Sequence, residues 1–546
     1  MLVRMSQMPF NSTIKNSCIQ SRNQHVWRKC GFSSQSKAPD VPLKPTISPF
    51  PPLKEPLQNL PTPIYSSAKV ENREPKISVL SNGLKVVSQD YFGQFATIGV
   101  AIDSGPRYEV AYPSGISHFL EKLAFNSTKN FQNNDHIMLS LEKYGGICLC
   151  DASRDTFIYY ASAERQALNT MTKVLGDIVL RPLLTEEELN LARQSIKFEI
   201  DSLSTSPDQE RLLLDMIHAA AYRDNTLGFP QICPAENLEK INRQILFTYL
   251  KSHYTPSRMV VAGIGVEHER LVEAVQKYFV DEKPIWEEER SLILSKGSEN
   301  VVDNSVAQYT DGFILEECNI PVHAGPSRLP ELSHIVIGLE GCSHHDSDFI
   351  PLCVLHTMMG GGGSFSIGGP GKGMYARLYS NVMNRYTWMY SAAAYNHCYG
   401  DTGLFYIHAS SASYPVDHVR EMTEVIVKEL VSMAGTITDN ELGRAKKQLQ
   451  SVLLMNLEHR TFVFEDIARQ VLATGSRQSP EHFIQEIAKV SKSDINRVAC
   501  RLLKSPPSVV ARGRVRNIPS HSDIQAGLLD AKGRIPTSKK QVAFKI

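Results

Sequence analysis

The spacing of apolar and polar positions predicts both strands and helices along this chain. Residues 76–89 (KISVLSNGLKVVSQ) form two alternating runs around Asn82-Gly83, a dipeptide typical of a tight β-hairpin turn. Further strand patterns cover residues 97–103 and 156–162, and helix patterns cover residues 115–125 and 185–203. The second of these helices begins with a threonine cap followed by glutamate. Strands and helices are therefore expected to be intermixed.

Part of this pattern recurs later in the chain. FIYYAS (157–162) recurs as FYIHAS (405–410), and the pattern T-x-x-E-L-x-x-A begins at Thr185 and again at Thr438. Residues 98–105 resemble residues 335–341 more loosely. Each match alone could arise by chance, but the preserved order indicates an internal duplication. We therefore predict an α+β fold built of two homologous α/β-roll halves.

The composition between these segments suggests where the halves begin and end. Nine prolines between Pro39 and Pro63 exclude a persistent helix or central strand there. Residues 281–330 hold ten acidic residues and few regular patterns. The expected division is therefore a leader (1–39), a Pro-rich linker (40–74), a first half (75–280), an acidic linker (281–330), a second half (331–525) and a tail (526–546).

The first 39 residues differ in charge from the rest of the chain. They carry six basic residues, seven serines and no acidic residue. This composition is typical of a mitochondrial transit peptide, although a disordered basic tail would share it. Without the six basic residues, 52 Lys and Arg remain against 57 Asp and Glu, so the mature protein is expected to be mildly acidic.

The overall composition excludes some classes of protein. At 42% hydrophobic and 21% charged residues, the chain resembles an ordinary globular protein, and no run of about 18 uncharged apolar residues indicates a membrane span. A formal net charge of +1 argues against a broad nucleic-acid-binding surface. Ten scattered cysteines include no zinc knuckle, so free thiols are expected.

A broken metal-binding motif lies on the predicted helix at residues 115–125. The sequence His118-Phe-Leu-Glu121-Lys122 follows the inverted zincin pattern H-x-x-E-H, in which two histidines bind zinc and the glutamate activates a water. Lys122 replaces the second histidine, and an ammonium group has no lone pair for a metal. A distant carboxylate would come from Glu199. We expect no metal on this chain and an ion pair of Lys122 with Glu121 or Glu199.

A glycine-rich segment occupies residues 360–373 (GGGGSFSIGGPGKG), where eight of fourteen residues are glycine. Such a density is expected to exclude helix and strand. A Walker A loop would need Ser or Thr after Lys372, and no strand precedes the segment as a dinucleotide site requires. A mobile lid that contacts a peptide substrate fits the embedded apolar residues better than a passive linker does. The expected substrate-binding residues are Gly360, Gly361, Gly362, Gly363, Ser364, Phe365, Gly368, Gly369, Gly371, Lys372 and Gly373.

Four motifs together resemble one family. They are GISHFLEKLAF (115–125), LEKYGGI (141–147), YTPSRM (254–259) and GMYARLY (373–379). Over roughly residues 75–525 the chain is similar to the mitochondrial processing peptidases, and specifically to their alpha-type subunits, within the pitrilysin group of inverted zincins.

The resemblance implies a non-catalytic subunit that recognises the presequences of imported precursor proteins. It implies a heterodimer in the mitochondrial matrix with the catalytic beta subunit of the processing peptidase, which would carry the zinc, and leaves attachment to the inner membrane open. The positions of His118, Glu121 and Glu199 match a metal site, yet Lys122 argues against a metal. The glycine-rich segment would bind the presequence.

Two other functions remain as alternatives. A core subunit of the respiratory cytochrome bc1 complex would share the fold and the degraded motif, but would have no need of a long glycine-rich segment. An active zinc endopeptidase would need an unusual set of ligands in place of Lys122.

Overall fold

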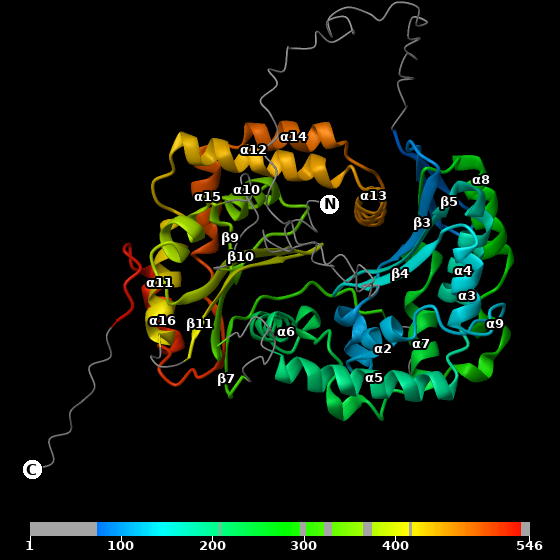
Figure 1. Ribbon diagram of the computed structural model, residues 1–546, viewed down its shortest axis with the longest axis horizontal. Helices are drawn as coiled ribbons and strands as arrows, with labels where there is room; N and C mark the ends of the chain where they lie inside the picture. The colour runs from blue at the N-terminus through cyan, green and yellow to red at the C-terminus, as the bar shows by residue number, and fades with distance from the viewer. Residues whose placement is uncertain are drawn as a thin grey trace, which may run out of the picture. The chain divides into compact units, whose positions relative to one another are not determined.

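The computed structural model describes residues 74–206, 209–294, 302–320, 330–363, 374–413 and 418–536 (Figure 1). The expected transit peptide and Pro-rich linker lie outside these residues. The described chain contains two mixed sheets with helices packed against them, which confirms an α+β fold of two related halves.

The first sheet has six strands in the order β1-β2-β6-β3-β5-β4. Only the β2–β6 pair is parallel. Its first two strands form the hairpin predicted around Asn82-Gly83, and Gly83 has the positive φ of 89° that this turn requires. The strands are β1 (Lys76–Val79), β2 (Lys85–Gln89), β3 (Phe95–Ile102), β4 (Ile147–Ala152), β5 (Phe157–Glu164) and β6 (Met259–Ile264).

The second sheet has the order β7-β12-β8-β11-β10-β9, and its one parallel pair is β7–β12. The run β7-β12-β8-β11-β10 therefore matches β2-β6-β3-β5-β4 in order and in direction. Its strands are β7 (Gly312–Glu317), β8 (Leu332–Glu340), β9 (Gly361–Gly363), β10 (Met389–Cys398), β11 (Gly403–Ala412) and β12 (Ser508–Gly513).

The register of the strands confirms the internal duplication. Ile98 of β3 pairs with Ala161 of β5, and Ile335 of β8 pairs with Ala409 of β11. These pairs are the positions that the repeated sequences bring into correspondence. The similarity between the two halves thus extends to individual strand pairs.

The helices are interspersed with the strands, and several follow one another directly. In the first part of the chain they are α2 (Ile116–Lys122), α3 (Asn134–Glu142), α4 (Leu168–Leu180), α5 (Glu186–Thr205), α6 (Glu210–Ala221), α7 (Arg243–His253), α8 (His268–Val275) and α9 (Ile285–Glu288). In the second part they are α10 (Phe349–Met359), α11 (Val419–Ser432), α12 (Asp439–Asn456), α13 (Arg460–Thr474), α14 (Pro480–Lys489), α15 (Lys492–Leu502) and α16 (His521–Leu529).

The long helices α5 and α12 correspond to each other. Thr185 and Thr438 cap them by accepting a hydrogen bond from the backbone N–H of Glu188 and Glu441, as the repeated motif predicted. Each helix then buries one apolar face at matching positions. The matching pairs are Leu189 with Leu442, Ala192 with Ala445, and Ile196 with Leu449.

The helix that follows each long helix packs on the sheet of the other half. Leu213 and Ile217 of α6 pack against residues of the second sheet such as Val336 and Val510. In return, Phe464 and Ile467 of α13 pack on the first sheet. Figure 1 shows this sheet lying between α13 on one face and α4 on the other. The two halves therefore exchange helices, and each sheet depends on the other half to bury one of its faces.

Close contacts at this exchange explain two glycines. A Cβ on Gly99 of β3 would lie 2.4 Å from Cζ of Phe464, and a Cβ on Gly312 of β7 would lie 2.5 Å from the carbonyl oxygen of Ala220. Both distances are too short for a side chain. At these two positions the exchanged helix lies so close to the opposite sheet that only glycine fits.

Three expectations about regular structure were wrong. The acidic segment 281–330 contains β7, which is held in the second sheet by β12. The expected tail begins inside α16, which ends only at Leu529. Residues 361–363 of the glycine-rich segment form strand β9, because backbone pairing with β10 compensates for the low strand propensity of glycine.

Two further properties bear on function. Among the described residues, no helix combines the length and the apolar composition needed to cross a membrane. The cysteines that the structure describes are free thiols, as expected.

Candidate functional site

The broken metal motif lies on α2, and the start of this helix is tightly constrained. Gly115 precedes it with φ 113°, and a Cβ there would lie 2.3 Å from Sγ of Cys233. The buried carboxylate of Glu109 accepts hydrogen bonds from the backbone N–H groups of Gly115 and Ser117, each at 2.6 Å. Burial raises the pKa of Glu109 to about 7 despite these bonds. The structure thus fixes where α2 begins and which way its motif residues face.

His118 is buried, and both of its ring nitrogens have partners. Nδ1 accepts a hydrogen bond from the backbone N–H of Cys233 at 3.2 Å, so the neutral ring carries its proton on Nε2. Nε2 lies 3.3 Å from Oε2 of Glu199 and donates to it. The nitrogen that would face a metal is therefore a hydrogen-bond donor here.

Glu199 of α5 is held by two cations. Nζ of Lys122 lies 2.5 Å from its Oε2, and a guanidinium nitrogen of Arg211 pairs with its Oε1. Hydrogen bonds from His118 and Lys122, together with the charge of Arg211, lower the pKa of Glu199. The carboxylate is thus ionised and engaged through both oxygens, and it joins α2, α5 and α6.

Glu121 faces the same group of side chains. Burial raises the pKa of its carboxyl group, and the charges of Arg211, His118 and Lys122 oppose that shift. No hydrogen bond joins its carboxylate to another of the described residues. The structure therefore brings all four motif positions together, namely His118, Glu121, Lys122 and Glu199, and we call these four with Arg211 the ion-pair cluster.

The residues of the ion-pair cluster do not fit a zinc ion. Lys122 has no lone pair to offer, Nε2 of His118 donates a proton, and both oxygens of Glu199 are occupied by cations. Across the part of the chain that the structure describes, no group of three or more His, Cys, Asp or Glu is arranged to hold a metal. The arrangement can cross-link three helices electrostatically, but it offers no site for metal-activated water.

The sequence did not reveal two members of this environment. Arg211 lies on α6 and follows no part of the zincin pattern, and Cys233 contributes only a backbone N–H. The sequence predicted an ion pair of Lys122 with either Glu121 or Glu199, and the structure shows the pair with Glu199.

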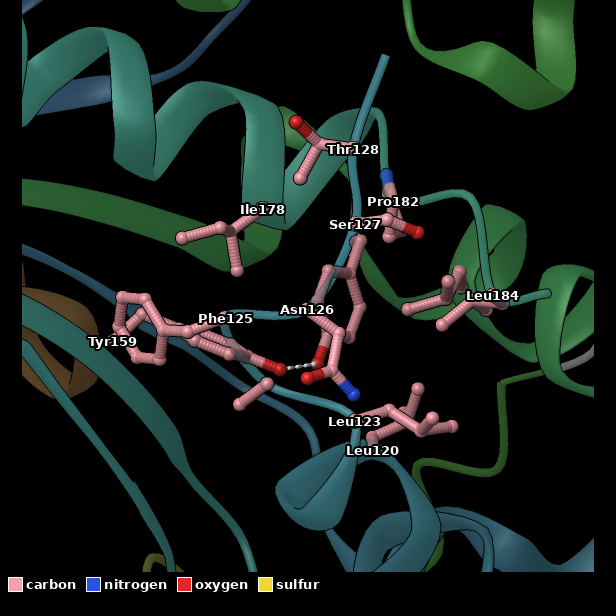
Figure 2. A pocket seen from close by; sticks show the side chains of 13 residues that line it. Leu120, Leu123, Phe125, Asn126, Ser127, Thr128, Tyr159, Ile178, Pro182 and Leu184 are labelled. Carbon is pink, nitrogen blue, oxygen red and sulfur yellow. Dashed lines mark hydrogen bonds between the residues drawn. The ribbon is translucent and has the colours of Figure 1, made fainter. Parts of the chain in front are cut away.

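A small cavity lies next to the C-terminal end of α2 (Figure 2). It is lined by Leu120, Phe125 and Asn126, and by the hydroxyl groups of Tyr159 and Tyr254, which are 3.0 Å apart. Its volume of about 20 Å³ is enough for roughly one water molecule. This cavity is too small to bind a peptide side chain.

The first glycines of the glycine-rich segment have a structural role. Gly360 ends α10 with φ 55°, and Gly361, with φ 104°, continues into β9. Cβ atoms at these positions would lie 2.5 Å from Cβ of Ala376 and 2.1 Å from the carbonyl oxygen of Ala392. The expected contact residues Ser364, Phe365, Gly368, Gly369, Gly371, Lys372 and Gly373 lie outside the described residues.

The sequence matches two family models. Residues 85–235 match the model of insulinase, peptidase family M16, and residues 240–449 match the model described as the peptidase M16 inactive domain. Together these two stretches make up more than half of the chain.

The chain is also similar to curated proteins. It is 50% identical over 509 residues to the mitochondrial-processing peptidase subunit alpha of Homo sapiens, with 92% of this chain and 93% of that protein covered. It is 40% identical to the subunit alpha of Caenorhabditis elegans (85% and 89% covered) and 33% identical to that of Solanum tuberosum (88% and 90% covered).

Among solved structures, the fold is similar to that of a protease from Helicobacter pylori. The TM-score is 0.69 at 19% sequence identity, with 82% of this chain and 100% of that chain covered. At this identity the likeness concerns the fold alone.

Proposed function

This chain belongs to peptidase family M16, and on that premise we propose that it is the alpha subunit of a mitochondrial processing peptidase. In this role it recognises the presequences of imported precursor proteins and performs no cleavage itself. The names of its relatives support a place in the processing-peptidase complex. The ion-pair cluster supports the proposal that this chain does not cleave.

The observation that carries the proposal is the pairing of Glu199 with Lys122 and Arg211. A catalytic zinc needs three protein ligands and one open position. Here the distal carboxylate is neutralised by protein cations, and the place of the second histidine holds an ammonium group. The cross-link that a metal would make between α2 and α5 is made by charged side chains instead.

Substrate recognition is assigned to the glycine-rich segment, residues 360–373. Its first glycines are fixed against β10 and α10, so the rest of the segment starts from a defined edge of the second sheet. Directly after it, Met374 is half exposed and Tyr375 is largely exposed. The guanidinium group of Arg444 lies 5.7 Å from the centre of the Tyr375 ring. Apolar and aromatic side chains at this edge suit the apolar face of an amphipathic peptide.

The proposed partner is the catalytic beta subunit of the processing peptidase, which would bind the zinc ion that this chain cannot hold. The proposed location is the mitochondrial matrix, where presequences arrive, with attachment to the inner membrane left open. Without its expected transit peptide the protein would be mildly acidic, which suits basic substrates, because complementary charge accelerates their encounter.

The two alternative functions receive less support. The relatives reported above are named as processing-peptidase subunits, which favours that function over a core subunit of the cytochrome bc1 complex. An active peptidase would have to use a zinc site in which Lys122 and Arg211 already occupy the carboxylate.

The test is cleavage of a fluorescent presequence peptide by the chain alone, by a zinc-bearing beta subunit alone, and by the two together. Only the mixture should cleave. Replacing residues 364–373 with a Gly-Ser sequence of equal length should raise KM at least about tenfold, whereas the same replacement of residues 321–329 should not.

A second variant separates recognition from catalysis. Glu121→Gln in this chain should leave kcat of the mixture unchanged, because no water is activated here. Cleavage by the chain alone, or a loss of kcat of about a hundredfold in Glu121→Gln, would contradict the proposal.

A further inference from the structure

Two arginines from different halves lie together where the connection between β2 and β3 meets the start of α13. Arg460 is the first residue of α13, and its guanidinium lies 5.4 Å from the centre of the Phe95 ring. Among the described residues, no hydrogen bond or ion pair satisfies this guanidinium, and its Nε is buried without a partner. An arginine that is partly buried and lacks an anionic partner needs an explanation.

Arg165 is the second cation. It follows β5, and its backbone N–H donates to the carbonyl oxygen of Gln94 at 2.9 Å, next to Phe95. Its Nε is likewise buried without a partner, while a terminal nitrogen donates to the carbonyl oxygen of Tyr91. The only carboxylate paired with it among the described residues is that of Asp90, which is 3.7 Å away and 64% exposed.

The two guanidinium groups are near enough to act on each other. Partial burial lowers the pKa of Arg460, Tyr91 opposes this shift, and the positive charge of Arg165 adds to it. Among the described residues, Arg165 has only the exposed carboxylate of Asp90 and Arg460 has none, so at least one positive charge remains uncompensated.

The start of α13 adds to this positive potential. His459, the residue before the helix, makes no capping bond, and the first turn contains no acidic residue. A helix begins with a partial positive charge, which usually attracts an acidic side chain rather than an arginine. Here the N-terminus of the helix and the two arginines are all positively charged.

We propose that Arg165 and Arg460 form a binding site for a phosphate group, carried either by a free anion or by a phospholipid headgroup. A phosphate at neutral pH carries a charge of about −1.5 to −2 and three acceptor oxygens, which matches two guanidinium groups at a helix end. Phe92, which is 82% exposed, lies on the same connection between β2 and β3. This site is independent of presequence recognition.

The first experiment measures binding of inorganic phosphate to the full chain by calorimetry at low salt. We expect saturable binding that weakens at least about tenfold in Arg460→Gln and in Arg165→Gln. Arg444→Gln is the matched control, because Arg444 is also an arginine beside an aromatic ring. Its affinity should equal that of the wild type. An unchanged affinity in Arg460→Gln, or no saturable binding by the wild type, would overturn the proposal.

The second experiment identifies the source of the phosphate by flotation with vesicles of phosphatidylcholine, with and without cardiolipin. Binding to cardiolipin vesicles that is lost in Arg460→Gln assigns the site to headgroups. Phosphate binding without vesicle binding assigns it to a free anion. Vesicle binding that persists in both arginine variants would contradict a headgroup site. Cleavage of a presequence peptide by Arg460→Gln and by Arg165→Gln, each with the partner subunit, shows that these two variants are folded. A midpoint of thermal unfolding equal to that of the wild type shows the same for Arg444→Gln.

Discussion

The two halves of this protein share a scaffold but differ at one helix contact. In the first half, α2 meets α5 through His118, Lys122 and Glu199. In the second half, α10 meets α12 through apolar side chains such as Leu352 and Leu449. Counting from the two capping threonines, Val452 stands in α12 where Glu199 stands in α5. The fold therefore needs a packed helix at this place, but it does not need charges there.

The comparison bears on the role of the ion-pair cluster. An apolar contact would be simpler, since buried charges cost desolvation that their pairing only partly offsets. The first half nevertheless has a histidine and two glutamates at the positions of the zincin motif and its distal ligand, and Lys122 and Arg211 pair with Glu199. The ion-pair cluster therefore acts as a structural cross-link between α2, α5 and α6.

The largest expected effect concerns the exchanged helices. Phe464→Ala should lower the free energy of unfolding by about 3–5 kcal/mol, because it leaves a cavity between α13 and the first sheet. Ile217→Ala on α6 should cost about 2–5 kcal/mol at the second sheet. Urea denaturation measures both. Phe462→Ala is the control, since Phe462 is less buried on the same helix. An equal loss of unfolding free energy in Phe464→Ala and Phe462→Ala would contradict the packing of α13 on the first sheet.

Acid should weaken the second sheet next. His218 of α6 and His397 of β10 are buried, and burial, helped by Arg154, lowers the pKa of both, that of His397 to about 3. Both are neutral when folded, but in the unfolded chain they take up protons below pH 6.5. Stability therefore falls as pH decreases from about 6.5, by roughly 1.4 kcal/mol per pH unit for each histidine.

Urea denaturation at pH 7.5, 6.5 and 5.5 measures this slope. His397→Gln should reduce it, and His482→Gln, at an exposed position, should leave it unchanged. A slope that is the same in His397→Gln and in the wild type would assign the acid sensitivity to other groups.

A smaller effect is expected within the ion-pair cluster. Glu199→Gln leaves Lys122 and Arg211 facing each other without a carboxylate, which should cost about 1–3 kcal/mol of unfolding free energy. Glu187→Gln on the exposed side of the same helix should change stability by less than about 0.5 kcal/mol. If the two substitutions cost the same, the charges do not cross-link the helices.

The smallest effect compares the two caps. Thr185 forms a full capping box, in which Glu188 also accepts from the backbone N–H of Thr185, while Thr438 makes only the single cap bond. Thr185→Ala should therefore cost about 1 kcal/mol and Thr438→Ala somewhat less. The midpoints of thermal unfolding would rank them. The reverse order would contradict the difference between the caps.

Much of the fold could be predicted because it depends on local patterns. The hairpin at Asn82-Gly83, the capped helices and the strand repeats follow from turn chemistry and periodicity. The exchange of α6 and α13 could not be predicted, since a helix pattern shows that one face is buried but not which sheet buries it. Strand β9 was missed for a similar reason, because its pairing comes from β10 and not from its own glycines.

The candidate site was predicted in part. The H-x-x-E-K spacing located His118, Glu121 and Lys122, and the distal carboxylate of the pattern located Glu199. The predicted partners of Lys122 were Glu121 or Glu199, and the structure shows Glu199. Arg211 was not predicted, because its contact with Glu199 depends on how α6 is placed beside α5 and no motif marks it. The Arg165–Arg460 pair joins residues nearly 300 positions apart and left no pattern in the sequence.

The most direct test is the zinc content of the purified full chain after equilibration with zinc and removal of the excess. The wild type should hold far less than one zinc per chain. Lys122→His/Arg211→Gln should hold close to one, because it supplies the second histidine and frees Glu199 to join His118 as a ligand. Stoichiometric zinc in the wild type that disappears in His118→Gln would show that Lys122 and Arg211 do not stand in place of a metal.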